Sequence, residues 1–82
     1  MDVMFYTYIL ESLKDPSQHY VGHTSDLRQR LTCHNEGLVV STSKFRPWKV
    51  KTYVAFDCIE KARTFEQYLK SGSGRAFRNK HF

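Results

Sequence analysis

The sequence has few of the features on which several classes of protein depend. It contains two cysteines, Cys33 and Cys58, and no C-x-x-C motif, so it predicts neither a disulfide scaffold nor a thiol redox motif. Its apolar runs are only a few residues long, which excludes a transmembrane span. Its first residues do not have the pattern of a signal peptide. We therefore expect a reduced, cytoplasmic protein that does not enter a membrane.

Length and charge further limit the kinds of protein that the sequence can encode. We expect one domain over residues 1–82, with a hydrophobic content of 40% that suffices for a single packed core. The net charge is +5, and the basic residues gather between residues 61 and 80, where Glu66 is the only acidic residue. Clustered positive charge suits a polyanion such as nucleic acid. A protein that merely has a basic tail is the alternative that charge leaves open.

Three segments have the pattern of β-strands. Residues 3–10 are apolar or aromatic, and residues 19–22 follow them after turn-forming residues 15–17, so the two segments are expected to pair as an antiparallel hairpin. Residues 48–56 alternate in polarity, which predicts a half-buried strand. Five side chains of this third strand are expected to share one face: Trp48, Val50, Thr52, Val54 and Phe56.

Two segments have the pattern of helices. The first, over about residues 24–35, begins with a Thr-Ser pair suited to capping and is followed by a glycine stop signal. The second begins at residues 57–60, which have capping-box spacing, and is broken after residue 70 by Ser-Gly-Ser-Gly. Residues 39–46 predict a short helix or an ordered loop, and residues 75–82 a short final turn. The fold class is therefore α/β (α+β), a small three-stranded antiparallel sheet flanked by helices.

Charged side chains lie at the edges of the buried helix faces. Projected around the first helix, Arg30 and His34 share one edge of the apolar stripe, whereas Arg28 points away from it. On the second helix, Glu66 lies at the edge of the stripe. Such groups can converge where helices meet a sheet, where charge interactions are stronger than in open solvent. Taken singly, Arg30 has the ordinary interpretation of a solvated cation, and Glu66 that of an i, i+4 ion pair with Lys70.

In combination, four features resemble the GIY-YIG nuclease family. They are Tyr6-Thr7-Tyr8 in the first strand, Tyr20-Val21-Gly22 in the second, Arg30 ten residues after Tyr20, and Glu66 in the last long helix. The likeness extends over about residues 4–77 and is greatest to small single-domain members related to the nuclease module of excision-repair endonucleases. Asn79 is an approximate counterpart of the late asparagine of that family.

The resemblance implies a set of catalytic residues and a cofactor. The five residues that match family positions are Tyr8, Tyr20, Arg30, His34 and Glu66. By resemblance, Glu66 binds one divalent metal, Mg²⁺ or Mn²⁺, and the metal and the arginine stabilise the phosphate. A tyrosine or the histidine helps to activate a water, and the choice among these three side chains stays open.

The resemblance also implies DNA as the partner. The activity expected is metal-dependent hydrolysis of DNA phosphodiester bonds in repair, recombination or processing. DNA is expected to contact four basic side chains near the end of the chain: Lys70, Arg75, Arg78 and Lys80. A protein partner or a homodimer that supplies specificity is a further expected partner. The alternatives are a non-catalytic nucleic-acid-binding module of the same fold and a subunit that needs a partner for DNA targeting.

Overall fold

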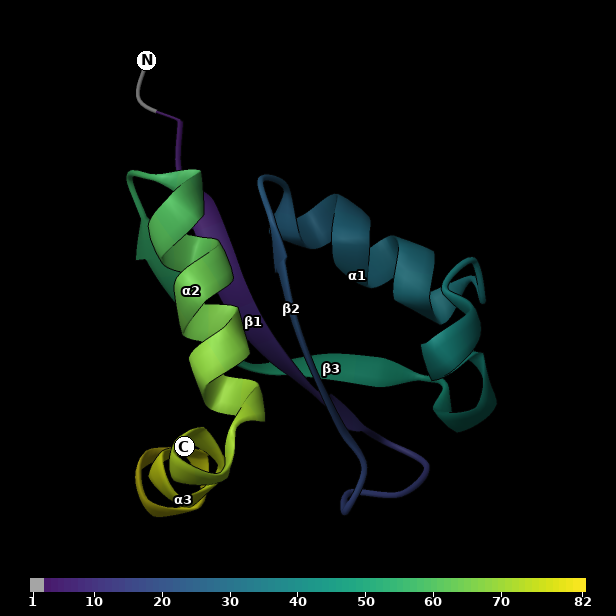
Figure 1. The fold of residues 1–82 in the computed structure, drawn as a ribbon. Coiled ribbons are helices and arrows are strands. Elements are labelled where there is room, and N and C mark those ends of the chain that lie inside the picture. Colours follow the sequence, from purple (N-terminus) through teal and green to yellow (C-terminus); the bar gives the residue numbers. More distant parts are fainter. Residues whose placement is uncertain (1–2) are drawn as a thin grey trace.

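The computed structural model describes residues 3–82 and has a three-stranded antiparallel sheet at its centre (Figure 1). The strands are β1 (Phe5–Ser12), β2 (His19–Thr24) and β3 (Trp48–Phe56). Their order across the sheet is β2-β1-β3, so the first strand is central and pairs antiparallel with both neighbours. The predicted hairpin and the predicted third strand are confirmed.

Helices cover both faces of the sheet. They are α1 (Leu27–Asn35), the 3-10 helix η1 (Val40–Phe45), α2 (Ile59–Lys70) and α3 (Gly72–His81). Figure 1 shows α1 on one side of the strands and α2 on the other. The α+β class is confirmed, and η1 occupies the segment for which a short helix or a loop was predicted. Within residues 3–82, no helix has the length and apolar character needed to cross a membrane.

Each face of the sheet has its own apolar cluster. On the α1 side, Tyr8 and Leu10 are buried with Trp48. On the α2 side, Ile9 is buried with Leu69. Because successive residues of a strand point to opposite faces, β1 contributes to both clusters. A strand buried on both faces has a continuous apolar sequence, which is the pattern that predicted β1.

β3 changes faces at one position. The pairing with β1 leaves Lys51 as an extra residue opposite the step from Ile9 to Leu10, which is a β-bulge. Before the bulge, Val50 packs on the α1 side. After it, Phe56 lies edge-to-face against a phenylalanine of α2, with ring centroids 5.7 Å apart. The prediction that five side chains of this strand share one face was therefore wrong. Burial alternates along the whole strand, but the bulge turns the buried side chains after it to the opposite face of the sheet.

The end of the chain forms a complete helix, α3, instead of the short turn predicted for residues 75–82. Ser71 follows α2 and caps α3, and its hydroxyl accepts a hydrogen bond from the Gly74 backbone N–H at 3.1 Å. Gly74 passes so close to the end of α2 that a Cβ there would overlap the carbonyl oxygen of Tyr68. The predicted break after residue 70 is confirmed, but the close approach allows a new helix to begin at Gly72.

The helix caps differ from the predicted ones. α1 is capped by Asp26, whose carboxylate accepts from the Gln29 N–H at 3.0 Å, and not by the preceding Thr-Ser pair. The Thr24 hydroxyl instead accepts from the Asp26 N–H at 3.1 Å. At the start of α2 the capping residue is Cys58, which makes no side-chain cap bond. The predicted capping box was therefore wrong, because the helix begins one residue later than that spacing requires and a thiol is a weak acceptor.

Gly74 and Gly72 provide a matched test of the contact between α2 and α3. We expect Gly74→Ala to lower the free energy of unfolding by roughly 1–3 kcal/mol, because the new methyl group overlaps backbone and forces the helices apart. Gly72→Ala should be neutral or stabilising by up to about 1 kcal/mol, because the site is open and alanine favours the helix. Urea denaturation of both variants measures the difference, and equal effects would contradict this packing.

Candidate active site

Gly22 makes room for two tyrosine rings. Gly22 is the cross-strand neighbour of Tyr8 in the β1–β2 pair. A Cβ at Gly22 would lie 2.6 Å from the Tyr8 hydroxyl oxygen and 3.0 Å from a ring carbon of Tyr20. The ring centroids of the two tyrosines are 6.3 Å apart. Sterics therefore require a glycine at this position of the Tyr-Val-Gly motif, because any side chain there would displace the Tyr8 hydroxyl.

A chain of buried hydrogen bonds starts at Tyr8 and runs through His34 to Thr42. His34, in the last turn of α1, is 0% exposed. Its Nε2 lies 2.9 Å from the Tyr8 hydroxyl and its Nδ1 lies 2.8 Å from the Thr42 hydroxyl. The Thr42 hydroxyl donates to the Val39 carbonyl at 3.2 Å, so its oxygen accepts from the Nδ1–H of His34. Nε2 is then the unprotonated nitrogen and accepts the hydrogen bond from the Tyr8 hydroxyl.

Burial keeps both members of the Tyr8–His34 pair uncharged at neutral pH. Burial, followed by the positive charge of Arg30, lowers the pKa of His34 to about 4. Burial also raises the pKa of Tyr8 to about 12, although the interaction with Arg30 opposes this rise. Both shifts favour the neutral form of the group. Tyr8 therefore acts as a phenol donor and His34 as an imidazole acceptor.

Arg30 places a fixed positive charge beside the two tyrosines. Its hydrogen bond with the Tyr8 hydroxyl is the main cause that raises the pKa of Arg30, and interaction with Tyr20 also contributes. The side chain is half-buried, whereas Arg28 on the same helix is exposed, as the helical projection predicts. Because a guanidinium stays protonated and donates in a forked geometry, Arg30 is suited to hold an oxyanion here.

Glu66 approaches the same region from the α2 side of the sheet. Its Oε1 lies 2.6 Å from His23 Nδ1, and its Oε2 lies 2.7 Å from Lys70 Nζ. Burial raises the pKa of Glu66, but the hydrogen bonds with Lys70 and His23 outweigh it and hold the pKa below its usual value. The negative charge of Glu66 also raises the pKa of Tyr8. The carboxylate is therefore ionised and within electrostatic range of Tyr8.

The donor chemistry around Glu66 fits a single hard cation. Within residues 3–82, no three His, Cys, Asp or Glu side chains gather to form a metal cluster. Mg²⁺ often binds through one or two carboxylates, with water and substrate phosphate completing its shell. The Glu66 side chain is 17% exposed and the Lys70 side chain 51%, so Lys70 can turn into solvent and free one carboxylate oxygen. The residues present therefore suit a cation whose other ligands come from water and substrate.

Four residues outside the predicted catalytic set help to build this region. The Asn35 amide donates to the Trp48 carbonyl at 3.0 Å and its Oδ1 accepts from the Trp48 N–H at 2.6 Å, which ties α1 to β3. The Trp48 indole donates to the Thr42 carbonyl at 2.8 Å and so fixes η1. His23, the partner of Glu66, lies two residues after the buried Val21. Because alternate residues of a strand share a face, this spacing indicated that His23 points to the same side as Val21. No pattern in the sequence indicated the role of Thr42.

The predicted DNA-contact residues differ in their surroundings. Lys70, Arg75 and Lys80 are exposed, and Lys70 is bonded to Glu66. Arg78 is half-buried and lines a cavity together with Asn79. None of the five predicted catalytic residues lines that cavity. Asn79 is thus grouped with Arg78 and not with the Tyr8–His34 pair.

A comparison with protein families agrees with this arrangement. A family model described as the GIY-YIG catalytic domain matches residues 4–80. Such domains define a superfamily of nucleases, which is the class that the fold and the tyrosine, arginine and glutamate side chains indicate. The chain belongs to the GIY-YIG family. The resemblance found in the sequence is confirmed.

Relatives of similar size are found in streptococci. The chain is 38% identical over 71 residues to a UPF0213 protein of Streptococcus pneumoniae serotype 4, which covers 85% of this chain and 70% of that protein. It is 33% identical over 72 residues to a UPF0213 protein of Streptococcus pyogenes serotype M3, which covers 87% of this chain and 76% of that protein. A UPF0213 protein of Streptococcus pyogenes serotype M1 matches to the same extent. The chain is therefore similar to small members of the family.

The low pKa of His34 predicts how stability depends on pH. Folded His34 stays unprotonated down to a pH of about 4, whereas an unfolded histidine takes up its proton near pH 6.5. Because the unfolded state binds more protons between these values, the free energy of unfolding should fall as the pH drops from 6.5 to 4. His34→Gln should flatten this dependence.

Urea denaturation across that pH range measures the slope for the wild type and for His34→Gln. The exposed His81 supplies the control, and His81→Gln should keep the wild-type slope. Identical slopes for the wild type and His34→Gln would contradict a buried, neutral imidazole.

Proposed function

We propose that the protein is a metal-dependent endonuclease that hydrolyses phosphodiester bonds of DNA, with a role in repair, recombination or processing. The observation that carries this proposal is that Arg30 lies beside the hydroxyls of Tyr8 and Tyr20 while the charge of Glu66 acts on the same place. These side chains come from α1, both strands of the hairpin and α2. Membership of a nuclease family supports the proposal.

Phosphodiester hydrolysis requires charge neutralisation at the phosphate. The Arg30 guanidinium can donate two parallel hydrogen bonds to the non-bridging oxygens. Glu66 would hold Mg²⁺ or Mn²⁺, and such an ion supplies Lewis-acid stabilisation of the phosphate and of the leaving oxygen. Lys70 is then free to contact a neighbouring phosphate. The four residues predicted for DNA contact, Lys70, Arg75, Arg78 and Lys80, add positive charge on the α2 and α3 side.

The nucleophilic water can lose its proton through Tyr8. Tyr8 does not act as a phenolate at neutral pH, because its pKa is about 12. Its oxygen can instead accept the water proton while its own proton moves to His34 Nε2, 2.9 Å away. A bound phosphate would offset the charge of Arg30, which helps to hold the pKa of His34 down, so substrate makes His34 a better acceptor. Tyr20, whose ring centroid lies 4.9 Å from that of His34, is the alternative entry for the proton.

One observation favours a second candidate, a non-catalytic nucleic-acid-binding module. Both carboxylate oxygens of Glu66 already have partners, His23 and Lys70, so its charge is satisfied by the chain alone. A related version of this candidate is a subunit that relies on a protein partner or a second copy for DNA targeting. Loss of cleavage on removing the carboxylate separates the nuclease from both.

Glu66→Gln should reduce Mg²⁺-dependent cleavage to background, because the neutral amide keeps the shape of the side chain and loses its affinity for a hard cation. DNA binding in EDTA should be kept or strengthened, because a negative charge that repels phosphate is removed. Glu60→Gln is the matched control on the same helix and should cleave as the wild type does. Normal Mg²⁺-dependent turnover by Glu66→Gln would overturn the assignment of Glu66 as the metal ligand.

Arg30→Ala should lower the cleavage rate by about 10²–10³, the effect of removing one preorganised donor to a transition state. Arg28→Ala removes the same charge from the same helix and should lose little, because its side chain is exposed. Single-turnover rates of the two variants give the comparison. If both lost the same amount, Arg30 would contribute only through general electrostatics.

A further inference from the structure

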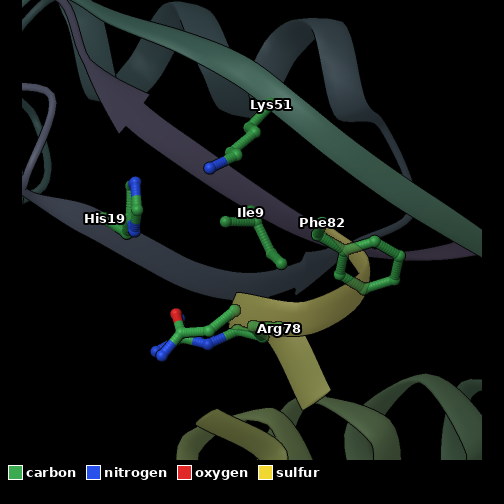
Figure 2. A pocket seen from close by; sticks show the side chains of 6 residues that line it. Ile9, His19, Lys51, Arg78 and Phe82 are labelled. Carbon is green, nitrogen blue, oxygen red and sulfur yellow. The ribbon is translucent and has the colours of Figure 1, made fainter. Parts of the chain in front are cut away.

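The polar cavity beside Arg78 is drawn in Figure 2. It lies on the side of the sheet to which Ile9 points, opposite to the side of Tyr8. Its volume is about 110 Å³ and it lies between the sheet and α3. The residues that line it are Ile9, His19, Lys51, Arg78, Asn79 and Phe82. Figure 2 shows His19 and Lys51 entering from two strands and Arg78 from α3. Basic side chains from three elements therefore meet around one small space.

Arg78 lacks an acceptor in this cavity. Its Nε is buried and has no hydrogen-bond partner among residues 3–82. Burial and the neighbouring charge of Arg75 lower the pKa of Arg78, so the guanidinium is desolvated and next to a like charge. Leaving a buried charged donor unsatisfied is unfavourable. A bound anion would supply both the acceptor and the opposite charge.

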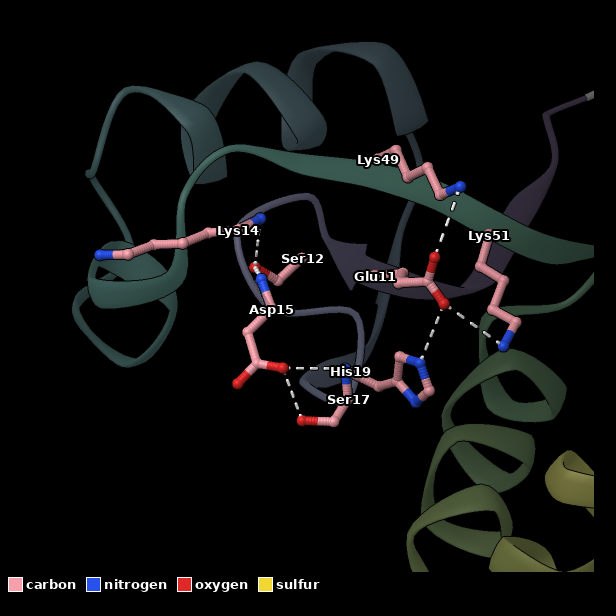
Figure 3. Close-up of polar contacts among 8 residues, drawn as sticks. All are labelled: Glu11, Ser12, Lys14, Asp15, Ser17, His19, Lys49 and Lys51. Carbon is pink, nitrogen blue, oxygen red and sulfur yellow. Dashed lines mark hydrogen bonds and ion pairs between the residues drawn. The ribbon is translucent and has the colours of Figure 1, made fainter.

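Glu11 contacts two residues that line the cavity, His19 and Lys51, but does not neutralise it. Figure 3 shows Glu11 between three basic side chains, His19, Lys49 and Lys51. Its Oε1 lies 3.3 Å from His19 Nε2 and 3.5 Å from Lys51 Nζ, and its Oε2 lies 3.4 Å from Lys49 Nζ. Because Lys51 is the extra residue of the β3 bulge, both lysines contact this same carboxylate. One carboxylate faces two lysines, and Arg78 is a further cation, so positive charge remains.

The size of the cavity suits a phosphate group. A cavity of about 110 Å³ has room for several water molecules, and so for a group of the size of phosphate. The anion therefore has the size of a phosphate whose other atoms extend into solvent.

The cavity and Glu66 share one face of the sheet, and each has a neighbouring histidine on the edge strand β2. His19 lines the cavity, and His23, on the same edge strand β2, contacts Glu66. Residues four apart on a strand point to one face and are separated by about 13 Å. A polyanion that follows the β2 edge can therefore reach both places.

We propose that this cavity binds a phosphate group, and that the group is a backbone phosphate of DNA lying along β2 from the one cleaved near Glu66. The second part rests on the proposed function. Arg78 and Lys51 contact the phosphate together, and His19 and Asn79 complete its surroundings. The cavity fixes the position of the strand and takes no part in the chemistry.

Duplex DNA binding in EDTA, followed by fluorescence anisotropy at several salt concentrations, tests this proposal. The double variant Arg78→Met/Lys51→Met should flatten the slope of log K against log salt by about 0.9, the change for one phosphate. Methionine keeps the side-chain stems, and Arg78→Lys, which keeps the charge, should keep the parent slope. The double variant Lys61→Met/Arg63→Met is the control of equal charge, because both side chains are exposed and neither lines the cavity. It should leave the slope unchanged.

Two outcomes for the slope would overturn the proposal. A parent-like slope for the double variant would show that no phosphate binds here. A change of about 1.8 would show that the two cations contact separate phosphates. Thermal unfolding of each variant verifies that the fold is kept.

Titration with inorganic phosphate, followed by the NMR signals of His19 and Arg78, separates the two sources of the group. If the signals shift with phosphate and then move to the positions of the DNA-bound protein when DNA is added, DNA has displaced the phosphate. That result supports a site for a backbone phosphate. Signals that respond to phosphate but not to DNA indicate a site for free phosphate and overturn the placement of DNA. EDTA stops metal-dependent cleavage, so cleavage is measured separately in Mg²⁺. A wild type that binds DNA through the cavity but does not cleave it in Mg²⁺ contradicts only the nuclease proposal. A cleaving enzyme with an unchanged slope contradicts only the cavity.

Discussion

The buried hydrogen bond between Tyr8 and His34 is the constraint on which the α1 side of the molecule depends. Both side chains are buried in the folded protein, so the polar atoms of each need partners inside the protein. Gly22 leaves the space for the phenol, and Thr42 accepts from the second ring nitrogen. Trp48 in turn fixes Thr42. The position of the Tyr8 oxygen beside Arg30 follows from satisfying this set of buried polar atoms.

The central strand separates two kinds of chemistry. On the α1 side, short hydrogen bonds between neutral groups define a path along which a proton can move. On the α2 side, ionised groups dominate: Glu66 with His23 and Lys70, and the basic cavity around Arg78. A phosphate near the β2 edge would meet both, because the charge of Glu66 acts on Tyr8 from the other layer. This division explains why a small chain suffices to bring a proton acceptor, a cation and a carboxylate together.

Local patterns in the sequence predicted most of the fold. The double-sided burial of β1, the hairpin and the break after residue 70 all depend on nearby residues, and all were confirmed. The exposure difference between Arg30 and Arg28 follows from helix geometry alone. The bulge at Lys51 depends on the register with β1, and the start of α3 depends on how closely Gly74 approaches α2. Neither can be read from a local pattern.

The candidate site was predictable to a similar degree. The family motif identified side chains that lie close together, but not the interactions that orient them. Glu66 and His23 are 43 residues apart in the chain, and Thr42 acts through a 3-10 helix whose position depends on Trp48. Such partners are defined by tertiary packing. Asn79 was matched to a family residue only by its position in the sequence. In the structure it lies with Arg78 around the cavity.

Direct observation of strand cleavage tests the central claim most simply. The wild-type protein would be incubated with branched, nicked and plain duplex DNA in Mg²⁺, in Mn²⁺ and in EDTA, and the products separated on a denaturing gel. The account predicts cleavage of at least one of these substrates with either metal and none in EDTA. Binding of all three substrates without cleavage in either metal, or undiminished cleavage in EDTA, would contradict it.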